Sequence, residues 1–110
     1  MKIRKDKYLK KRGGKARIIN VSCIKCGRLI FVYQKDWPRG WLKRCYLNRI
    51  IKPKKYENLQ YNKNIKDVKD LKNLICYCGM IIGYPMKHKE GRLAYLLVRK
   101  TFKRTNNKEE

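Results

Sequence analysis

The chain is built from short apolar runs that are rich in β-branched and aromatic residues and are separated by basic segments. Two such runs, 18–23 (IINVSC) and 28–33 (RLIFVY), flank the tight segment 23–27 (CIKCG). β-Branched and aromatic side chains favour strands, and a glycine-containing connection between two strands is typical of a hairpin. The run 74–84 (LICYCGMIIGY) repeats this arrangement. The pattern therefore predicts two strand–turn–strand units, each with a pair of cysteines in its turn.

Segment 41–51 (WLKRCYLNRII) fits either a helix or a strand. A helix would gather its apolar positions on one face, these being Leu42, Cys45, Tyr46 and Ile50. A strand would divide them, with Leu42, Tyr46 and Ile50 on one face. Because a short apolar run cannot be assigned by periodicity alone, we favour a strand on the aromatic and β-branched content of the segment.

The remaining segments are connections and short elements. Segment 36–40 (DWPRG) is predicted to be a turn, because proline and glycine interrupt regular structure. Segment 52–64 is polar and is predicted to be an exposed loop. Apolar residues three apart in 65–74 predict a short helical turn, and 91–103 predicts a last strand that starts at a glycine.

Length and charge divide the chain into three parts. A chain of 110 residues is one domain. The first 17 residues include nine Lys or Arg, so we expect 1–17 to be a basic arm that is disordered in isolation, because it has little apolar surface to bury. We expect the folded domain to span 18–103 and a polar tail to span 104–110.

The charge indicates the kind of partner. There are 31 Lys and Arg against 8 Asp and Glu, a formal net charge of +23, and such a field attracts polyanions. A membrane is the weaker candidate, because no apolar run approaches the ~18 residues of a spanning helix. The lysines near the N-terminus are not followed by an apolar stretch, so we expect no secretory signal and a cytoplasmic protein.

Four of the five cysteines form two close pairs. In a reducing compartment such pairs indicate a metal site before a disulfide, and zinc prefers four tetrahedral ligands in a structural site. The sequence therefore predicts one structural Zn²⁺ held by Cys23, Cys26, Cys76 and Cys78. The second pair is C-x-C, one residue shorter than the usual spacing, which leaves Cys45 and His88 as substitute ligands. The simpler interpretation makes Cys45 a small buried hydrophobic residue and His88 a solvated surface residue.

The order of these motifs resembles a known family. The two cysteine pairs are about fifty residues apart, Gly83-Tyr84 and 89–92 (KEGR) follow the second pair, and 40–47 (GWLKRCYL) lies between them. This order resembles the Yippee-type proteins and the wider β-tent zinc domains, which include the thalidomide-binding domain of cereblon and the B-type methionine sulfoxide reductases. The resemblance implies a mainly β fold in which two antiparallel sheets are pinned by zinc through the four paired cysteines. A zinc ribbon with a long insertion, as in small uncharacterised prokaryotic zinc proteins, is the alternative fold.

Three functions are compatible with these features. We expect a non-catalytic protein that binds nucleic acid, RNA rather than DNA, or the ribosome, because basic residues neutralise phosphates and exposed aromatic rings stack on unpaired bases. The predicted surface consists of Lys35, Trp37, Arg39, Trp41, Lys43, Arg44 and Arg49.

The two other functions would depend on different residues. A protein- or small-ligand-binding module would use an aromatic pocket of Trp37, Trp41 and Tyr84. An enzyme similar to a sulfoxide reductase would need a reactive cysteine outside the metal site, and Cys45 with His88 is the one available set. We therefore expect the chain not to be an enzyme.

Overall fold

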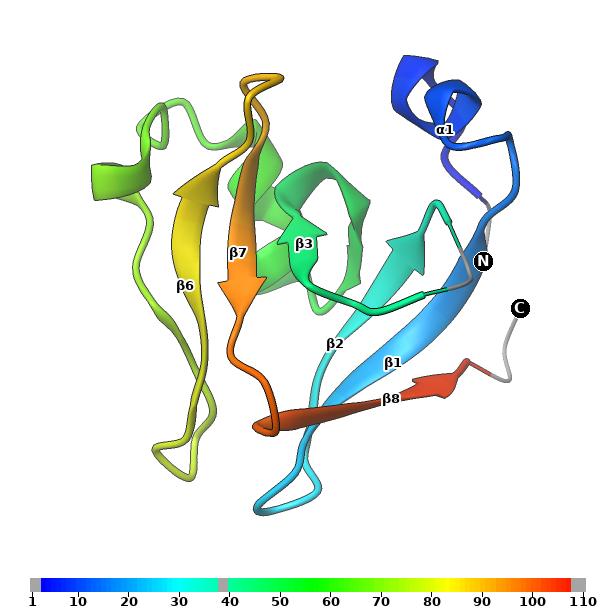
Figure 1. Ribbon diagram of the computed structural model, residues 1–110. Coiled ribbons are helices and arrows are strands. Elements are labelled where there is room, and N and C mark those ends of the chain that lie inside the picture. The colour runs from blue at the N-terminus through cyan, green and yellow to red at the C-terminus, as the bar shows by residue number, and fades with distance from the viewer. Residues whose placement is uncertain (1–2, 38–39, 108–110) are drawn as a thin grey trace.

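The computed structural model describes residues 3–37 and 40–107, which form a mainly β structure with two antiparallel sheets (Figure 1). Its strands are β1 (Arg17–Cys23), β2 (Leu29–Lys35), β3 (Arg44–Tyr46), β4 (Ile50–Lys52), β5 (Leu74–Ile75), β6 (Ile81–Lys87), β7 (Leu93–Leu97) and β8 (Phe102–Asn106). The helical elements are α1 (Lys7–Lys11), α2 (Lys54–Glu57) and the 3₁₀ turns η1 (Leu47–Arg49), η2 (Asn58–Tyr61) and η3 (Val68–Asp70). In the described part of the chain, no helix has the length and apolar content to span a membrane. The predicted mainly β fold class is confirmed.

The two sheets contain different parts of the chain. The first has the strand order β4-β2-β1-β8, and the second has the order β3-β7-β6-β5. The β1–β2 and β6–β7 hairpins form the centres of the two sheets, with Ile19 opposite Tyr33 in the first and Tyr84 opposite Leu96 in the second. The predicted strand–turn–strand units are β1–β2 and β5–β6, so each sheet contributes one cysteine-bearing turn.

One apolar core serves both sheets. Val21 and Phe31 from the first sheet and Ile82 and Tyr95 from the second belong to a single cluster of buried residues. The buried hydroxyl of Tyr33 accepts a hydrogen bond of 2.8 Å from the backbone N–H of Tyr46, which connects β2 to β3 of the other sheet. Packing and polar contacts therefore hold the two sheets together, and Cys23 and Cys76 are part of the shared core.

The structure of residues 41–74 agrees with the predictions only in part. Segment 41–51 forms β3 and the start of β4, as expected for a strand, but η1 interrupts it. Segment 52–64 is not the exposed loop that we predicted, because α2 and η2 occupy it and Tyr56 and Leu59 pack against the core. The helical turn predicted in 65–74 is present as η3, which Asp67 caps through a 2.8 Å bond from the N–H of Val68.

The C-terminal part forms two strands where we predicted one. Strand β7 ends at Leu97, and the chain turns through Lys100, whose φ of 67° lies in the left-handed region. Strand β8 then pairs with β1 and continues to Asn106, beyond residue 103 where the folded domain was expected to end.

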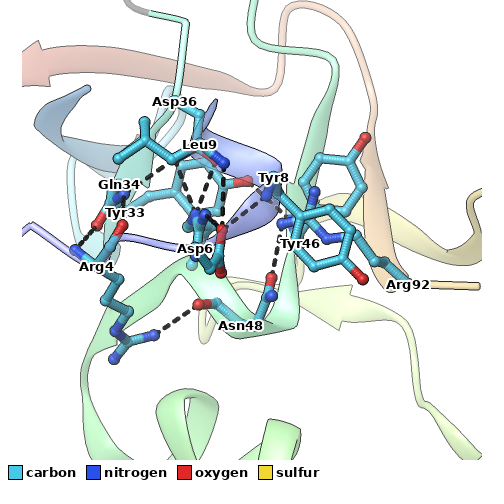
Figure 2. Close-up of polar contacts among 11 residues, drawn as sticks. Arg4, Asp6, Tyr8, Leu9, Tyr33, Gln34, Asp36, Tyr46, Asn48 and Arg92 are labelled. Atoms are coloured by element: carbon cyan, nitrogen blue, oxygen red, sulfur yellow. Dashed lines mark hydrogen bonds and ion pairs between the residues drawn. The ribbon is translucent and has the colours of Figure 1, made fainter. Parts of the chain in front are cut away.

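The described part of the N-terminal segment packs against the rest of the fold, where the sequence led us to expect a basic arm that is disordered in isolation. Helix α1 begins after Asp6, whose side chain accepts hydrogen bonds from the N–H groups of Tyr8 and Leu9, and Leu9 is buried. Arg4 forms an ion pair of 2.8 Å with Glu57. It also donates a 2.8 Å bond to the carbonyl of Asn48, which Figure 2 shows. These partners lie more than forty residues away, so the composition of the segment could not indicate them.

Candidate functional site

The first cysteine turn connects β1 to β2. Cys23 is the last residue of β1, and its N–H donates a 2.9 Å bond to the carbonyl of Arg28 across the turn. The N–H of Gly27 donates a 2.9 Å bond back to the carbonyl of Cys23. Gly27 has a φ of 77°, which an L-residue rarely adopts, so glycine directly after Cys26 allows the chain to close this turn.

The second turn has the same design with one residue fewer. The N–H of Cys76 donates a 2.9 Å bond to the carbonyl of Met80, and the N–H of Gly79 donates a 2.8 Å bond to the carbonyl of Cys76. Gly79 directly follows Cys78 and has a φ of 95°. The C-x-C spacing therefore reflects a turn that is one residue shorter, and both of its cysteines still belong to the cluster.

The two turns lie at the same end of the molecule and bring four sulfurs together (Figure 1). The Sγ atoms of Cys23 and Cys78 are 3.6 Å apart, those of Cys26 and Cys76 are 3.5 Å apart, and all four lie within 4.8 Å of one another. A tetrahedral ion with Zn–S bonds of about 2.3 Å requires sulfurs about 3.8 Å apart. The four cysteines therefore fit a metal ion that would link the two sheets.

Each turn has one buried and one exposed cysteine, and the pKa values of the two buried thiols shift in opposite directions. Cys23 and Cys76 are buried, while Cys26 and Cys78 are exposed at the rim. The N–H groups of Cys26 and Lys25 point at the sulfur of Cys23 and lower its pKa to about 7, against the opposing effect of burial. For Cys76, the N–H of Cys78 acts to lower the pKa, but burial and the neighbouring sulfurs outweigh it and raise the pKa to about 11.

Cys45 and His88, the substitute ligands, lie outside the sulfur cluster. Cys45 is completely buried in β3, and burial raises its pKa well above the usual value. His88 lies against Tyr46 in an edge-on ring contact of 5.7 Å and is 3.0 Å from a carboxylate oxygen of Glu90. Cys45 is thus the small buried residue of the simpler interpretation, whereas His88 is half-buried and paired, not solvated.

A second feature is a hollow of about 300 Å³ between the two sheets, which we call the basic hollow. Its wall contains six basic residues, two tryptophans and one acidic residue. The lining residues are Arg12, Tyr33, Lys35, Asp36, Trp37, Gly40, Trp41, Leu42, Lys43, Arg44, Tyr46, Arg49 and Arg92. Six of the seven residues of the predicted nucleic-acid surface are in this list, and the seventh, Arg39, lies outside the described residues.

Two of those six are not surface groups. Arg49 is only 1% exposed and is neutralised, with hydrogen bonds of 2.6 and 2.9 Å to Asp6 and of 2.8 and 3.0 Å to Asp36. Lys35 is also buried and donates to the carbonyl of Trp37. Burial lowers the pKa of Lys35, and the charges of Arg104 and Arg12 act in the same direction. Arg49 was therefore wrongly predicted as a binding residue, because a buried ion pair holds the fold together here.

Four other cations of the basic hollow lack an acidic partner within the described part of the chain. In residues 3–37 and 40–107, no acidic side chain forms an ion pair with Arg12, Lys43, Arg44 or Arg92. Trp41 is 75% exposed and Trp37 is also exposed. The hollow therefore combines uncompensated positive charge with two accessible indole rings.

Arg92 is held in place by aromatic rings. Its guanidinium carbon lies 3.8 Å from the ring centroids of both Tyr8 and Tyr46, and the side chain donates a 2.8 Å bond to the amide oxygen of Asn48 (Figure 2). The Nε of Arg92 is buried and has no hydrogen-bond partner among the described residues. Arg92 and Arg12 were not predicted as binding residues, because both are distant along the chain from the segment around Trp41.

The aromatic pocket expected for a protein- or small-ligand-binding module is present only in part. Trp37 and Trp41 both line the basic hollow, but Tyr84 is exposed on β6 and is not one of its lining residues. The three rings therefore do not gather in one cavity.

Comparison with protein-family models, curated proteins and solved structures finds no match for this chain. The resemblance to Yippee-type and β-tent proteins therefore stays a prediction, and function has to be argued from the site itself.

Proposed function

We propose that this protein is a non-catalytic zinc protein that binds nucleic acid, RNA or the ribosome in particular, through the basic hollow. The proposal combines a structural role for the cysteine cluster with a binding role for the hollow. Both parts depend on the same architecture, because the cysteine turns fix the two sheets whose residues line the hollow.

Zinc is the metal that the ligand set favours. Tetrahedral coordination by four thiolates is typical of Zn²⁺ or of iron–sulfur centres, and four protein ligands leave no open position for a substrate. A closed site of this kind contributes folding free energy, because the metal binds the folded chain and not the unfolded one. Thiolate ligands also need the reduced state that the cytoplasm maintains, which supports a cytoplasmic protein.

The observation that carries the binding proposal is the composition of the basic hollow. Arg12, Lys43, Arg44 and Arg92 place four cations around one concavity, and within the described residues none has an acidic partner. Phosphates would supply the missing counter-charge and release their own counterions. Trp37 and Trp41 add ring faces on which bases can stack.

A catalytic role has less support. The thiolate is the reactive form of cysteine, and complete burial raises the pKa of Cys45 well above the usual value. We therefore propose that Cys45 is a core residue and not a nucleophile.

Binding to a labelled RNA oligonucleotide at several salt concentrations tests the proposal. If four cations neutralise phosphates, log K should fall with log salt with a slope of about −3 for a single strand. The double variant K43Q/R44Q should weaken binding and reduce this slope by about 1.4, since two phosphate contacts are lost.

The matched control is K63Q/K72Q, which removes two exposed lysines outside the hollow. It should leave both the affinity and the slope close to those of the parent. Equal effects of the two double variants would show that net charge alone is responsible and would refute binding at the hollow. An affinity that does not change with salt would refute the proposal as a whole.

A further inference from the structure

A larger and mainly apolar groove lies directly beside the basic hollow. This apolar groove has a volume of about 1050 Å³. Its lining residues are Gly40, Trp41, Leu42, Lys43, Leu96, Leu97, Arg99, Lys100, Phe102, Lys103 and Arg104. The groove therefore lies between segment 40–43, strand β7 and strand β8, on the side where the β7–β8 turn joins the two sheets.

The groove and the hollow share one wall. Gly40, Trp41, Leu42 and Lys43 line both of them. Trp41 is largely exposed, and the guanidinium carbon of Arg99 lies 5.1 Å from the centroid of its ring. A ligand that follows this wall from the hollow enters the groove over the indole of Trp41.

The two cavities differ in chemistry. Leu42, Leu96, Leu97 and Phe102 give the groove apolar surface, and apolar side chains offer no hydrogen bonds to a phosphate. Apart from Trp41, its other side chains are cationic, and no acidic residue is among the described residues that line it. An apolar floor suits the flat face of a base, and the surrounding cations suit the phosphates on either side.

We propose that the ligand class is single-stranded nucleic acid, with an unstacked base bound in the apolar groove against Trp41 and the adjoining phosphate bound in the basic hollow. This inference rests on the proposed function and specifies it further. In a duplex the bases are paired and stacked, so a duplex could offer phosphates to the hollow but no base to the groove. The juxtaposition of an apolar and a cationic cavity across one exposed tryptophan therefore selects the single strand.

Contact between a base and Trp41 can be followed through the fluorescence of this tryptophan. Trp37 and Trp41 are its two tryptophans, so W37F leaves Trp41 as the single source of indole fluorescence and keeps an aromatic ring face at position 37. We would titrate W37F with a pyrimidine single strand, with an abasic strand of the same length, and with a duplex of the same sequence, all at low salt. The intact strand should quench Trp41 fluorescence and bind about tenfold more tightly than the abasic strand, because one stacked base contributes about that factor.

Two leucines of similar exposure provide a matched pair of variants. Leu96 on β7 is 46% exposed and lines the groove, whereas Leu29 on β2 is 49% exposed and lines neither cavity. L96S should weaken binding of the intact strand and leave binding of the abasic strand unchanged. L29S should leave the affinity for both strands unchanged. Metal content and circular dichroism establish that both variants are folded.

The outcomes separate the two proposals. If the intact strand, the abasic strand and the duplex bind equally and Trp41 is not quenched, base binding in the groove is refuted while phosphate binding at the hollow stands. If none of the three binds at low salt, the proposed function itself is refuted and this inference with it. Quenching and tighter binding by the intact strand alone would support the inference.

Discussion

Arg49, buried in the turn between β3 and β4, forms a two-bond ion pair with Asp6, which lies 43 residues earlier and starts helix α1. The Arg49 guanidinium holds the pKa of Asp6 down to about 2, against the opposing effect of burial, and the N–H bonds from Leu9 and Tyr8 act in the same direction as Arg49. A basic N-terminal segment is thus fixed to a basic domain through one of the few acidic residues in the chain.

The first prediction concerns Asp6. D6N removes one of the two carboxylates that neutralise buried Arg49, and we expect it to lower stability by about 1–2 kcal/mol, allowing for the solvent screening of a partly exposed carboxylate. The helix cap itself should survive, because asparagine caps as well as aspartate. D67N is the control, since Asp67 caps η3 without an arginine partner, and its melting temperature should stay within about a degree of the parent's.

The pH dependence of this effect has a definite sign. Because the pKa of Asp6 is lowered from 3.8 to about 2 in the folded state, its contribution is complete above about pH 4 and is lost as the pH falls toward 2. The difference in melting temperature between parent and D6N should therefore narrow over that range. A difference that stays constant down to pH 2 would contradict the ion pair.

The second prediction concerns Tyr8, one of the two rings that enclose Arg92. Y8A removes one face of this contact and some buried ring area, so we expect a loss of about 1–2 kcal/mol, measured as a fall in melting temperature. Y61A is the control, because Tyr61 is 71% exposed and forms no ring contact among the described residues. If both variants melt like the parent, the N-terminal segment does not dock as described.

The third prediction concerns Cys45. The metal-loaded protein should not react with an alkylating reagent at Cys45 until it unfolds, because the thiol is buried and its pKa is raised. C45A should bind as much metal as the parent, and neither protein should reduce methionine sulfoxide. Rapid modification of Cys45 in the folded protein, located by mass spectrometry, would reopen the enzymatic interpretation.

Some elements could be predicted because their sequence patterns lie within a few neighbouring residues. The strands on both sides of 23–27 and 76–79, and the glycine after each cysteine pair, follow from residue types within a few positions. The metal ligands could be grouped for the same reason, since two short cysteine turns in one small chain have few other uses. The shortened second turn needed the structure, which shows that its bonds from Cys76 to Met80 and from Gly79 to Cys76 match those of the first turn.

The features that the sequence did not indicate depend on distant partners. The segment 1–17 resembles a disordered arm in composition, yet Asp6 and Arg4 find partners more than forty residues away. Arg49 resembles a phosphate-binding residue beside Trp41, and only the fold shows that two carboxylates neutralise it. The charge of a residue therefore does not predict its exposure to a ligand when its ion-pair partner lies in a distant part of the chain.

We propose above all that four cysteines from two distant turns hold one zinc ion that links the two sheets. The most direct test is the metal content of the purified protein, measured together with its melting temperature before and after a strong chelator. We predict one zinc ion per chain, a large fall in melting temperature on chelation, and loss of the metal in C76S and C78S but not in C45A. A protein that carries no stoichiometric metal and melts at the same temperature with and without the chelator would contradict the account.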